Sequence, residues 1–114
     1  MHVTRGNEAK DYEAPGHHGV QTVRLQGAEA SPVEAFSLGI SHFEPGGGAD
    51  MSATPMEKVY YVVEGEITIE LENGSEVLKA GDSCYLPPNE ARAVKNNYDG
   101  KTTMLVAMTY PPAS

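Results

Sequence analysis

The sequence predicts an all-β fold, an antiparallel sandwich or barrel, and two observations lead to that prediction. Twelve glycines and eight prolines interrupt the 114 residues at short intervals, and no long hydrophobic period of 3.6 residues survives between them. Short runs of alternating or β-branched side chains fill the intervals, each bounded by a turn signal. A chain of this length forms about one domain. Many short strands in one domain indicate a single sandwich or barrel.

Three strands are predicted in the first half of the chain. Residues 20–25 form a short β-branched run, and residues 36–43 alternate apolar and small side chains until Pro45 and Gly46 stop the pattern. Residues 59–63, with the sequence VYYVV, are entirely β-branched or aromatic, the composition that strands favour.

The second half begins with the strictest alternation in the chain. Residues 67–72, with the sequence ITIELE, are followed by Asn73 and Gly74, a pair typical of tight hairpin turns. Residues 76–78 are therefore expected to pair back across that turn. Further strands are predicted at 83–86, at 93–95 and at 102–110.

The two ends of the chain differ from its middle. Residues 1–19 are mostly polar and predict an N-terminal arm or loop ahead of a barrel at 20–110, with residues 111–114 as a tail. The N-terminus has no apolar core of the kind that signal peptides need. The single cysteine, Cys84, has no partner for an internal disulfide. Together these features predict a cytoplasmic protein.

Charge and hydropathy exclude two classes of partner. The chain has 8 basic and 16 acidic residues, a formal net charge of −8, and no cluster of lysine or arginine. An acidic surface repels phosphate backbones, so nucleic acid is not an expected partner. No apolar run approaches the roughly 18 residues of a membrane-spanning helix, so a membrane is not expected either. A small molecule is the expected ligand.

The spacing of the glycines resembles the two motifs of small single-domain cupins, G-x5-HxH-x3-E-x6-G and G-x5-PxG-x2-H-x3-N. The first motif falls on Gly46 to Gly65, and the second on Gly81 to Asn96, with Asn89 in place of one glycine. Asparagine tolerates the left-handed backbone that this glycine provides. The resemblance covers roughly residues 20–110 and implies a double-stranded β-helix, the jelly-roll barrel of cupins, in a single domain.

The resemblance also shows where the cupin metal site would lie. In cupins, three histidines and one glutamate converge on a transition metal, and the corresponding positions here are Ser52, Thr54, Lys58 and Arg92. Hydroxyl groups are poor ligands for such metals, and the cationic side chains of lysine and arginine repel a dication. We therefore expect no metal and no cofactor at these positions.

In the implied barrel, Lys58 and Arg92 point into the cavity that a metal occupies in other cupins. Two buried positive charges are costly unless a carboxylate, a bound anion or solvent compensates them. The interpretation we favour is a small anionic or oxygenated metabolite gripped by the Arg92 fork. In the alternative, both side chains reach solvent or pair with acids such as Glu57 or Glu90. The predicted ligand-binding residues are Arg92, Lys58, Ser52, Thr54 and Met56.

Three residues are predicted to be catalytic. Lys58, beside an arginine in a partly dry pocket, would lose its proton more easily and serve as a general base or as an amine nucleophile towards a carbonyl. Tyr60 is two residues farther along the same strand and therefore shares its face. His42 follows an apolar face of its strand and is expected to project into the barrel as an acid–base group. The alternative is a core or rim histidine satisfied by a hydroxyl or carbonyl.

Two further features have a structural interpretation. His17 and His18 lie in a segment flanked by proline and glycine, for which a solvated loop is the favoured interpretation. The alternatives are a loop folded over the barrel mouth, or a rebuilt metal site that combines one of them with His42. Cys84 has no neighbouring base and is interpreted as a small hydrophobic side chain.

Three classes of function remain open. The first is a metal-independent enzyme such as an isomerase, epimerase, cyclase, lyase or dehydratase; the second is a non-catalytic binding module; the third is an accessory protein with a plugged cavity. Polar and cationic replacements at the ligand positions favour the first two classes. A metal-dependent oxygenase is less favoured because it needs the lost ligands. Open sheet edges and the N-terminal arm predict a homodimer.

Overall fold

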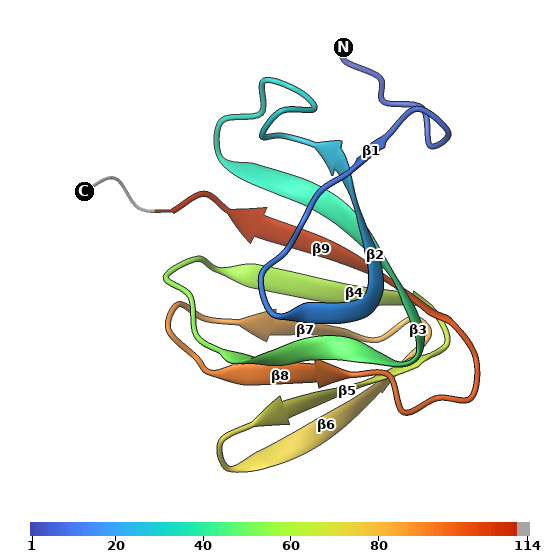
Figure 1. Ribbon diagram of the computed structural model, residues 1–114. Coiled ribbons are helices and arrows are strands. Elements are labelled where there is room, and N and C mark those ends of the chain that lie inside the picture. The colour runs from blue at the N-terminus through green and yellow to red at the C-terminus, as the bar shows by residue number, and fades with distance from the viewer. Residues whose placement is uncertain (112–114) are drawn as a thin grey trace.

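Nine strands form one antiparallel sheet that curls into a nearly closed barrel in the computed structural model, which describes residues 1–111 (Figure 1). The expected all-β jelly-roll barrel is confirmed, and residues 1–111 contain no helix. The hydrogen-bonded order is β6-β5-β8-β3-β9-β4-β7, with β2 on β3 and β1 on β2. The strands are β1 (Lys10–Asp11), β2 (His17–Gln26), β3 (Phe36–Ser52), β4 (Lys58–Glu64), β5 (Glu66–Leu71), β6 (Gly74–Lys79), β7 (Ser83–Leu86), β8 (Arg92–Lys95) and β9 (Thr102–Thr109).

The long strand β3 lies in the middle of the strand order and links the two halves of the sheet. On one edge, its first half pairs with β9 and its second half pairs with β8, while β2 pairs with both halves. The change of partner coincides with Gly46, whose φ of +83° is accessible to glycine at little cost. A Cβ on Gly48 would lie 2.1 Å from the carbonyl oxygen of Val94, so only glycine permits this approach of β3 to β8.

The barrel interior is mostly apolar, with a few polar and charged side chains among the apolar ones. Along β4, Lys58, Tyr60 and Val62 point inward and are buried, whereas the intervening side chains are exposed. The apolar core is formed by Phe43, Ala49, Tyr60, Val62, Ile67, Ile69, Leu78, Leu86, Val94 and Met104. Lys58 is the first residue of β4 and belongs to this inward set, so its charge lies on the barrel side of the strand.

The predicted hairpin exists, but its turn is displaced by one residue. Glu72 and Asn73 form the turn, and Gly74 already pairs with Leu71 as the first residue of β6. Asn73 and Gly74 were expected to occupy the turn positions. The observed register places the buried Ile67 opposite the buried Leu78.

Asn96, the last position of the second cupin motif, ties three segments together. Its buried side-chain amide donates hydrogen bonds to the carbonyl oxygens of Phe43, Glu44 and Gly100 at 3.0–3.2 Å. Its side-chain oxygen accepts hydrogen bonds from the Tyr98 amide and the Thr102 hydroxyl, both at 3.1 Å. Every polar atom of this side chain is therefore used to hold the bend of β3 against the loop between β8 and β9.

The chain crosses the barrel between β1 and β2 (Figure 1). After β1, the amide of Tyr12 donates to the carbonyl of Thr22, and the carbonyl of Gly16 accepts from the amide of Asp50. We call residues 12–17 the strap; Figure 1 shows it as part of the blue loop between β1 and β2. β2 begins at His17, three residues before the expected start of the barrel at residue 20. Of the expected tail, residues 112–114 lie outside the described residues.

No helix long and apolar enough to cross a membrane occurs in residues 1–111. The expected homodimer remains a prediction. A molecular mass of one chain by light scattering at micromolar concentration would contradict it.

Candidate functional site

The barrel interior contains a cavity of about 510 Å³. Its apolar wall comes from β3, β8, β9 and the loop before β4, through Phe43, Val94, Met104, Val106, Met108 and Met56. All the predicted ligand-binding residues line it: Ser52, Thr54, Met56, Lys58 and Arg92, joined by Tyr60. A volume of this size falls within the range of small-molecule sites.

Arg92 is held at the wall of the cavity by neutral groups. It is the first residue of β8 and pairs in register with Ser52 of β3. Its Nε donates to the hydroxyl of Tyr60 at 2.8 Å, and one terminal nitrogen, Nη1, donates to the hydroxyl of Ser52 at 2.8 Å and to its carbonyl at 3.4 Å. The side chain is only 5% exposed, and within residues 1–111 no carboxylate forms an ion pair with it. The guanidinium charge is buried without a neutralising partner.

Lys58 is buried in the same cavity and is only 8% exposed. Among the described residues, no hydrogen bond or ion pair reaches its amine. Among residues 1–111, every side-chain nitrogen or oxygen that solvent cannot reach has a hydrogen-bond partner. Because Nζ of Lys58 has no such partner, solvent in the cavity must reach it. Burial, and secondly the positive charge of Arg92, lower the pKa of Lys58 from 10.5 to about 8.

The acidic partners considered as an alternative do not neutralise these two cations. Glu57 accepts a hydrogen bond of 2.7 Å from the hydroxyl of Tyr85 instead, and Glu90 forms no ion pair in residues 1–111. Neither acid lines the cavity. The alternative in which both side chains extend out of the barrel is also wrong, because Lys58 and Arg92 are buried and only solvent within the cavity reaches the Lys58 amine.

Tyr60 completes the cluster of polar groups inside the barrel. Burial raises its pKa, against the opposing effect of the Arg92 charge, so the phenol remains protonated at neutral pH. Its oxygen accepts the hydrogen bond from Arg92, which leaves the hydroxyl proton available for donation. A neutral proton donor therefore lies next to a buried guanidinium and on the same strand face as Lys58.

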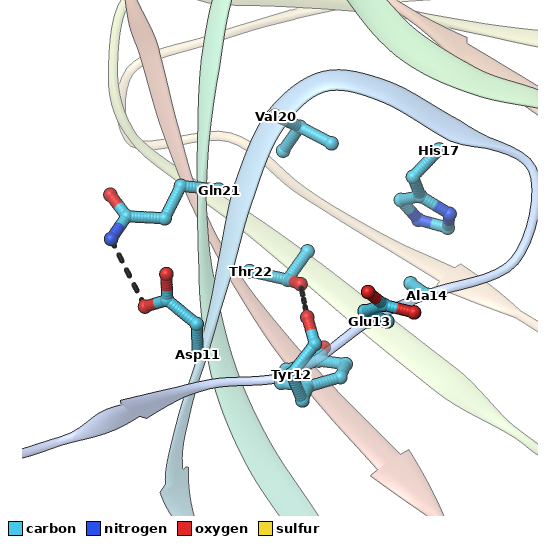
Figure 2. A pocket seen from close by; sticks show the side chains of 8 residues that line it. All are labelled: Asp11, Tyr12, Glu13, Ala14, His17, Val20, Gln21 and Thr22. Carbon is cyan, nitrogen blue, oxygen red and sulfur yellow. Dashed lines mark hydrogen bonds between the residues drawn. The ribbon is translucent and has the colours of Figure 1, made fainter.

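The strap contributes residues to the cavity; the sequence interpretation offered a loop over the barrel mouth as an alternative for His17, but it did not identify Tyr12 or Glu13. Tyr12, Glu13 and His17 line the cavity, and Glu13 is the only carboxylate among the described lining residues. Arg24 of β2 also lines the cavity, with its guanidinium carbon 3.9 Å from the centre of the Tyr12 ring. Figure 2 shows the strap leaving Asp11, passing Glu13 and Ala14, and returning at His17.

The two adjacent histidines have different surroundings. His17 lies at the cavity, with Nδ1 3.0 Å from the Pro15 carbonyl, so the favoured interpretation of a solvated loop was wrong for this residue. His18 remains exposed, 3.6 Å from the carboxylate of Asp50. The flanking proline and glycine were a signal for the turn itself, but a crossing of the barrel mouth has no periodic pattern from which to predict it.

A second hollow lies beside the cavity. It is not lined by Lys58 or Arg92, which we call the cationic pair. Its volume is about 540 Å³, and the strap and β2 form it between Asp11 and Thr22 (Figure 2). Gln21 donates to Asp11 at 3.1 Å, and the hydroxyl of Thr22 donates to the Tyr12 carbonyl. These contacts fix the strap against β2, which makes the hollow a structural feature of the strap.

His42 is on the opposite face of β3 from the one expected. The inward residues of this strand before Phe43 are small, namely Ser37, Gly39 and Ser41, whereas the apolar side chains of Leu38 and Ile40 lie on the outer face with His42. Part of that outer face is covered by the N-terminal residues, and His42 lines a separate hollow there with Nδ1 3.2 Å from the Thr103 hydroxyl. The projection of His42 into the barrel as an acid–base group is therefore wrong, and the other interpretation, a histidine satisfied by a hydroxyl, is the one observed.

The residues at the cupin metal positions do not fit a transition metal. Two are hydroxyl side chains, one is an arginine whose nitrogens are directed to Tyr60 and Ser52, and one is Lys58. Within residues 1–111, no three histidine, cysteine or acidic side chains come together in a way that would hold a metal ion. The lone thiol of Cys84 is half-buried, and burial raises its pKa.

Comparison with known proteins gives one relative over nearly the full length. A protein of Mycobacterium tuberculosis named beta-D-galactosidase Rv1717 is 40% identical over 113 residues, which are 99% of this chain and 97% of that protein. Among solved structures, the polyketide cyclase RemF of Streptomyces resistomycificus superposes with a TM-score of 0.84 at 18% identity, covering 96% of this chain and 79% of its own.

A second solved structure leads to the same fold. An RmlC-like cupin of Shewanella frigidimarina superposes with a TM-score of 0.78 at 21% identity, covering 96% of this chain and 90% of its own. The sequence pattern of the cupin domain family matches residues 39–108. This range contains Lys58, Arg92 and the apolar residues of the cavity wall named above. The chain therefore belongs to the cupin family.

Proposed function

We propose that the barrel cavity binds a small anionic or oxygenated metabolite and acts on it by acid–base chemistry without a resident metal. The observation that carries the proposal is the burial of Arg92 and Lys58 in one cavity with no carboxylate paired to either among the described residues. Uncompensated buried charges are costly, and a bound anion removes much of that cost.

The hydrogen bonds that Arg92 already makes define what it can offer a ligand. Nε and Nη1 are used by Tyr60 and Ser52, whereas Nη2 has no partner among residues 1–111. The neighbouring amine of Lys58 is equally unpaired. These two groups are the cationic donors available to a carboxylate or to the hydroxyl groups of a ligand.

The groups around Lys58 support acid–base chemistry. An amine with a pKa of about 8 is partly unprotonated at neutral pH and accepts a proton from a carbon next to a carboxylate or carbonyl. The protonated phenol of Tyr60 is the matching acid. Isomerisation, epimerisation and β-elimination all use such a pair, and these are the reaction classes that we propose.

Hydrolysis of a β-galactoside is the second candidate function, favoured by the 40% identity with the mycobacterial protein. Most glycosidases use two carboxyl groups, one as acid and one as base or nucleophile. Among the described residues, the cavity presents one carboxyl group, that of Glu13 on the strap. In this second proposal Glu13 is the acid, so hydrolysis of a nitrophenyl β-D-galactoside should fall at least tenfold in Glu13→Gln.

Calorimetric titration with D-galacturonate, D-galactose and methyl β-D-galactoside tests the first proposal, because the first differs from the second by its carboxylate. We expect galacturonate to bind about tenfold more tightly than galactose, since a charge-assisted hydrogen bond contributes about 1.5–3 kcal/mol. Arg92→Gln should remove that preference while retaining a side-chain donor for Tyr60.

Lys95→Gln is the matched control for the loss of one positive charge. Lys95 lies on the same strand as Arg92, but it is exposed and paired with Glu70 at 3.1 Å. Its substitution should leave all three affinities unchanged. Equal binding of galactose and galacturonate, unaltered in Arg92→Gln, would show that the cationic pair does not select an anion and would favour the neutral galactoside.

A further inference from the structure

We infer that Lys58 binds its ligand covalently, as an imine between Nζ and an aldehyde or ketone carbon, and that the ligand class is a carbonyl compound with an adjacent carboxylate, such as a 2-oxo acid. The inference rests on the proposed function, because it uses the same cavity and the same cationic pair. It adds a bond and a ligand class that a non-covalent anion site does not require.

The first support is the different surroundings of the two cations. Arg92 makes three hydrogen bonds to protein groups and is fixed in place. Lys58 makes none among the described residues, yet its nitrogen is not sealed from the cavity. A structural lysine in a barrel would be expected to find a carboxylate or carbonyl. An unpaired amine at a cavity wall is instead free to react.

The second support is the apolar setting of the Lys58 side chain. On the neighbouring strands it pairs in register with Leu86 and Met108, and Met56 lies at the same cavity wall. Apolar surroundings and a nearby guanidinium both favour the neutral amine, which is the form that attacks a carbonyl carbon. The burial that is costly for the ammonium therefore makes the amine a nucleophile.

The third support is the position of Tyr60. It follows Lys58 by two residues and shares its strand face, and its oxygen is engaged by Arg92 while its proton is free. In the first step, the Nζ lone pair forms a bond to the carbonyl carbon and the carbonyl oxygen takes a proton from the phenol, giving a carbinolamine. In the second, the nitrogen gives one proton back to the Tyr60 phenolate and the other to the hydroxyl group, which leaves as water as the C=N bond forms.

The remaining donor of the site determines the ligand class. The Nη2 group of Arg92 has no partner among residues 1–111, and its charge is close enough to lower the pKa of Lys58. A carboxylate bound there brings the adjacent carbon of the same small ligand towards the amine. A 2-oxo acid places a ketone or aldehyde at that carbon, which a simple carboxylic acid does not.

Reductive trapping tests the covalent bond directly. The full chain is incubated at pH 7.5 with glyoxylate or pyruvate and cyanoborohydride, and peptide mass spectrometry measures the rate of labelling at each of the five lysines. We expect Lys58 to be labelled about tenfold faster than any other, because amines of ordinary pKa are almost fully protonated at that pH. Lys101, which is exposed and paired with Glu44 at 3.4 Å, is the internal reference.

Two comparisons decide between the possible outcomes. Acetaldehyde lacks the carboxylate, so the ratio of Lys58 to Lys101 labelling should be several-fold smaller with acetaldehyde than with glyoxylate, and Arg92→Gln should abolish that difference. Lys58→Arg keeps the cation but cannot form an imine, and should lose the fast labelling with the other lysines unchanged. Labelling of Lys58 no faster than that of Lys101 would overturn the inference.

The same preparation separates this inference from the proposed function. Galacturonate and lactate binding, measured without cyanoborohydride, reports on the anion site alone. Binding that depends on Arg92 without fast labelling of Lys58 would remove the imine and leave the anion site standing. Fast labelling with equal ratios for glyoxylate and acetaldehyde would overturn the 2-oxo acid as the ligand class.

Discussion

Replacing Asn96 with alanine is expected to lower the free energy of unfolding by about 3–5 kcal/mol, a large part of the total stability of a domain this size. The substitution leaves three backbone carbonyls and one backbone amide without their side-chain partner, the Phe43 carbonyl in a buried place and the other three groups in partly buried ones. Each unsatisfied buried group costs about 1–3 kcal/mol, reduced where the loop relaxes or water enters. Urea denaturation of the two proteins measures the difference.

Asn97 provides the matched control for this experiment. It is the next residue, it is exposed, and its side chain makes a single 3.3 Å hydrogen bond with the hydroxyl of Thr68. Asn97→Ala should change stability by about 0.5 kcal/mol or less. Asn96→Asp has nearly the native shape but turns an acceptor towards three carbonyl oxygens, so it should be at least as destabilising as alanine. Equal stabilities of Asn96→Ala and Asn97→Ala would contradict the role of the clamp.

Lys58→Met is expected to stabilise the fold at pH 7 by about 2 kcal/mol, the opposite direction from most core substitutions. Methionine retains the apolar stem and removes an ammonium that is buried without a partner. The cost of burying the ammonium also lowers the pKa of Lys58 from 10.5 to about 8, so the pKa change indicates the size of the expected stabilisation. Water in the cavity screens part of that cost.

The sign of the pH dependence follows from that lowering. Below pH 8 the amine carries its proton in both the folded and the unfolded chain, so the folded protein bears the full cost of burial. Between pH 8 and 10.5 the unfolded chain binds more protons, and the stability of the wild type therefore rises with pH. The advantage of Lys58→Met should shrink across this window. The other titratable or charged groups that line the cavity are Arg92, Arg24, Tyr60, Tyr12, Glu13 and His17.

Chemical denaturation of both proteins at pH 7, 9 and 10.5 measures this trend. Lys101→Met is the control, because the Lys101 side chain is 70% exposed and its removal should have little effect at any of these pH values. A Lys58→Met protein that is less stable than the wild type at pH 7 would mean that the amine has a stabilising partner.

The barrel and the cationic pair could be predicted from the sequence because both depend on fixed spacing. Alternation and turn residues predicted the strands, and the resemblance placed Lys58 and Arg92 in the cavity. The alternation gave the wrong face for His42, because the inward residues of β3 before Phe43 are small, whereas its apolar alternation lies on the outer face, part of which the N-terminal residues cover.

The position of the strap at the cavity does not follow from the sequence pattern, and the reason differs from that for His42. Its place at the cavity depends on backbone hydrogen bonds to residues distant in sequence, such as the bond between Gly16 and Asp50. Backbone groups are the same in every residue, so no side-chain pattern indicates such a crossing. Glu13, the only carboxylate among the described lining residues, was missed for this reason.

The strap also makes the connection between β1 and β2 part of the binding site. The strap residues that line the cavity are Tyr12, Glu13, Ala14, Pro15 and His17, and backbone hydrogen bonds to Thr22 and Asp50 hold the strap in place. An insertion or deletion between β1 and β2 therefore rebuilds one wall of the cavity while leaving the barrel strands that carry Lys58 and Arg92 unchanged. Chains that differ only in residues 12–17 should differ in the ligands that they bind.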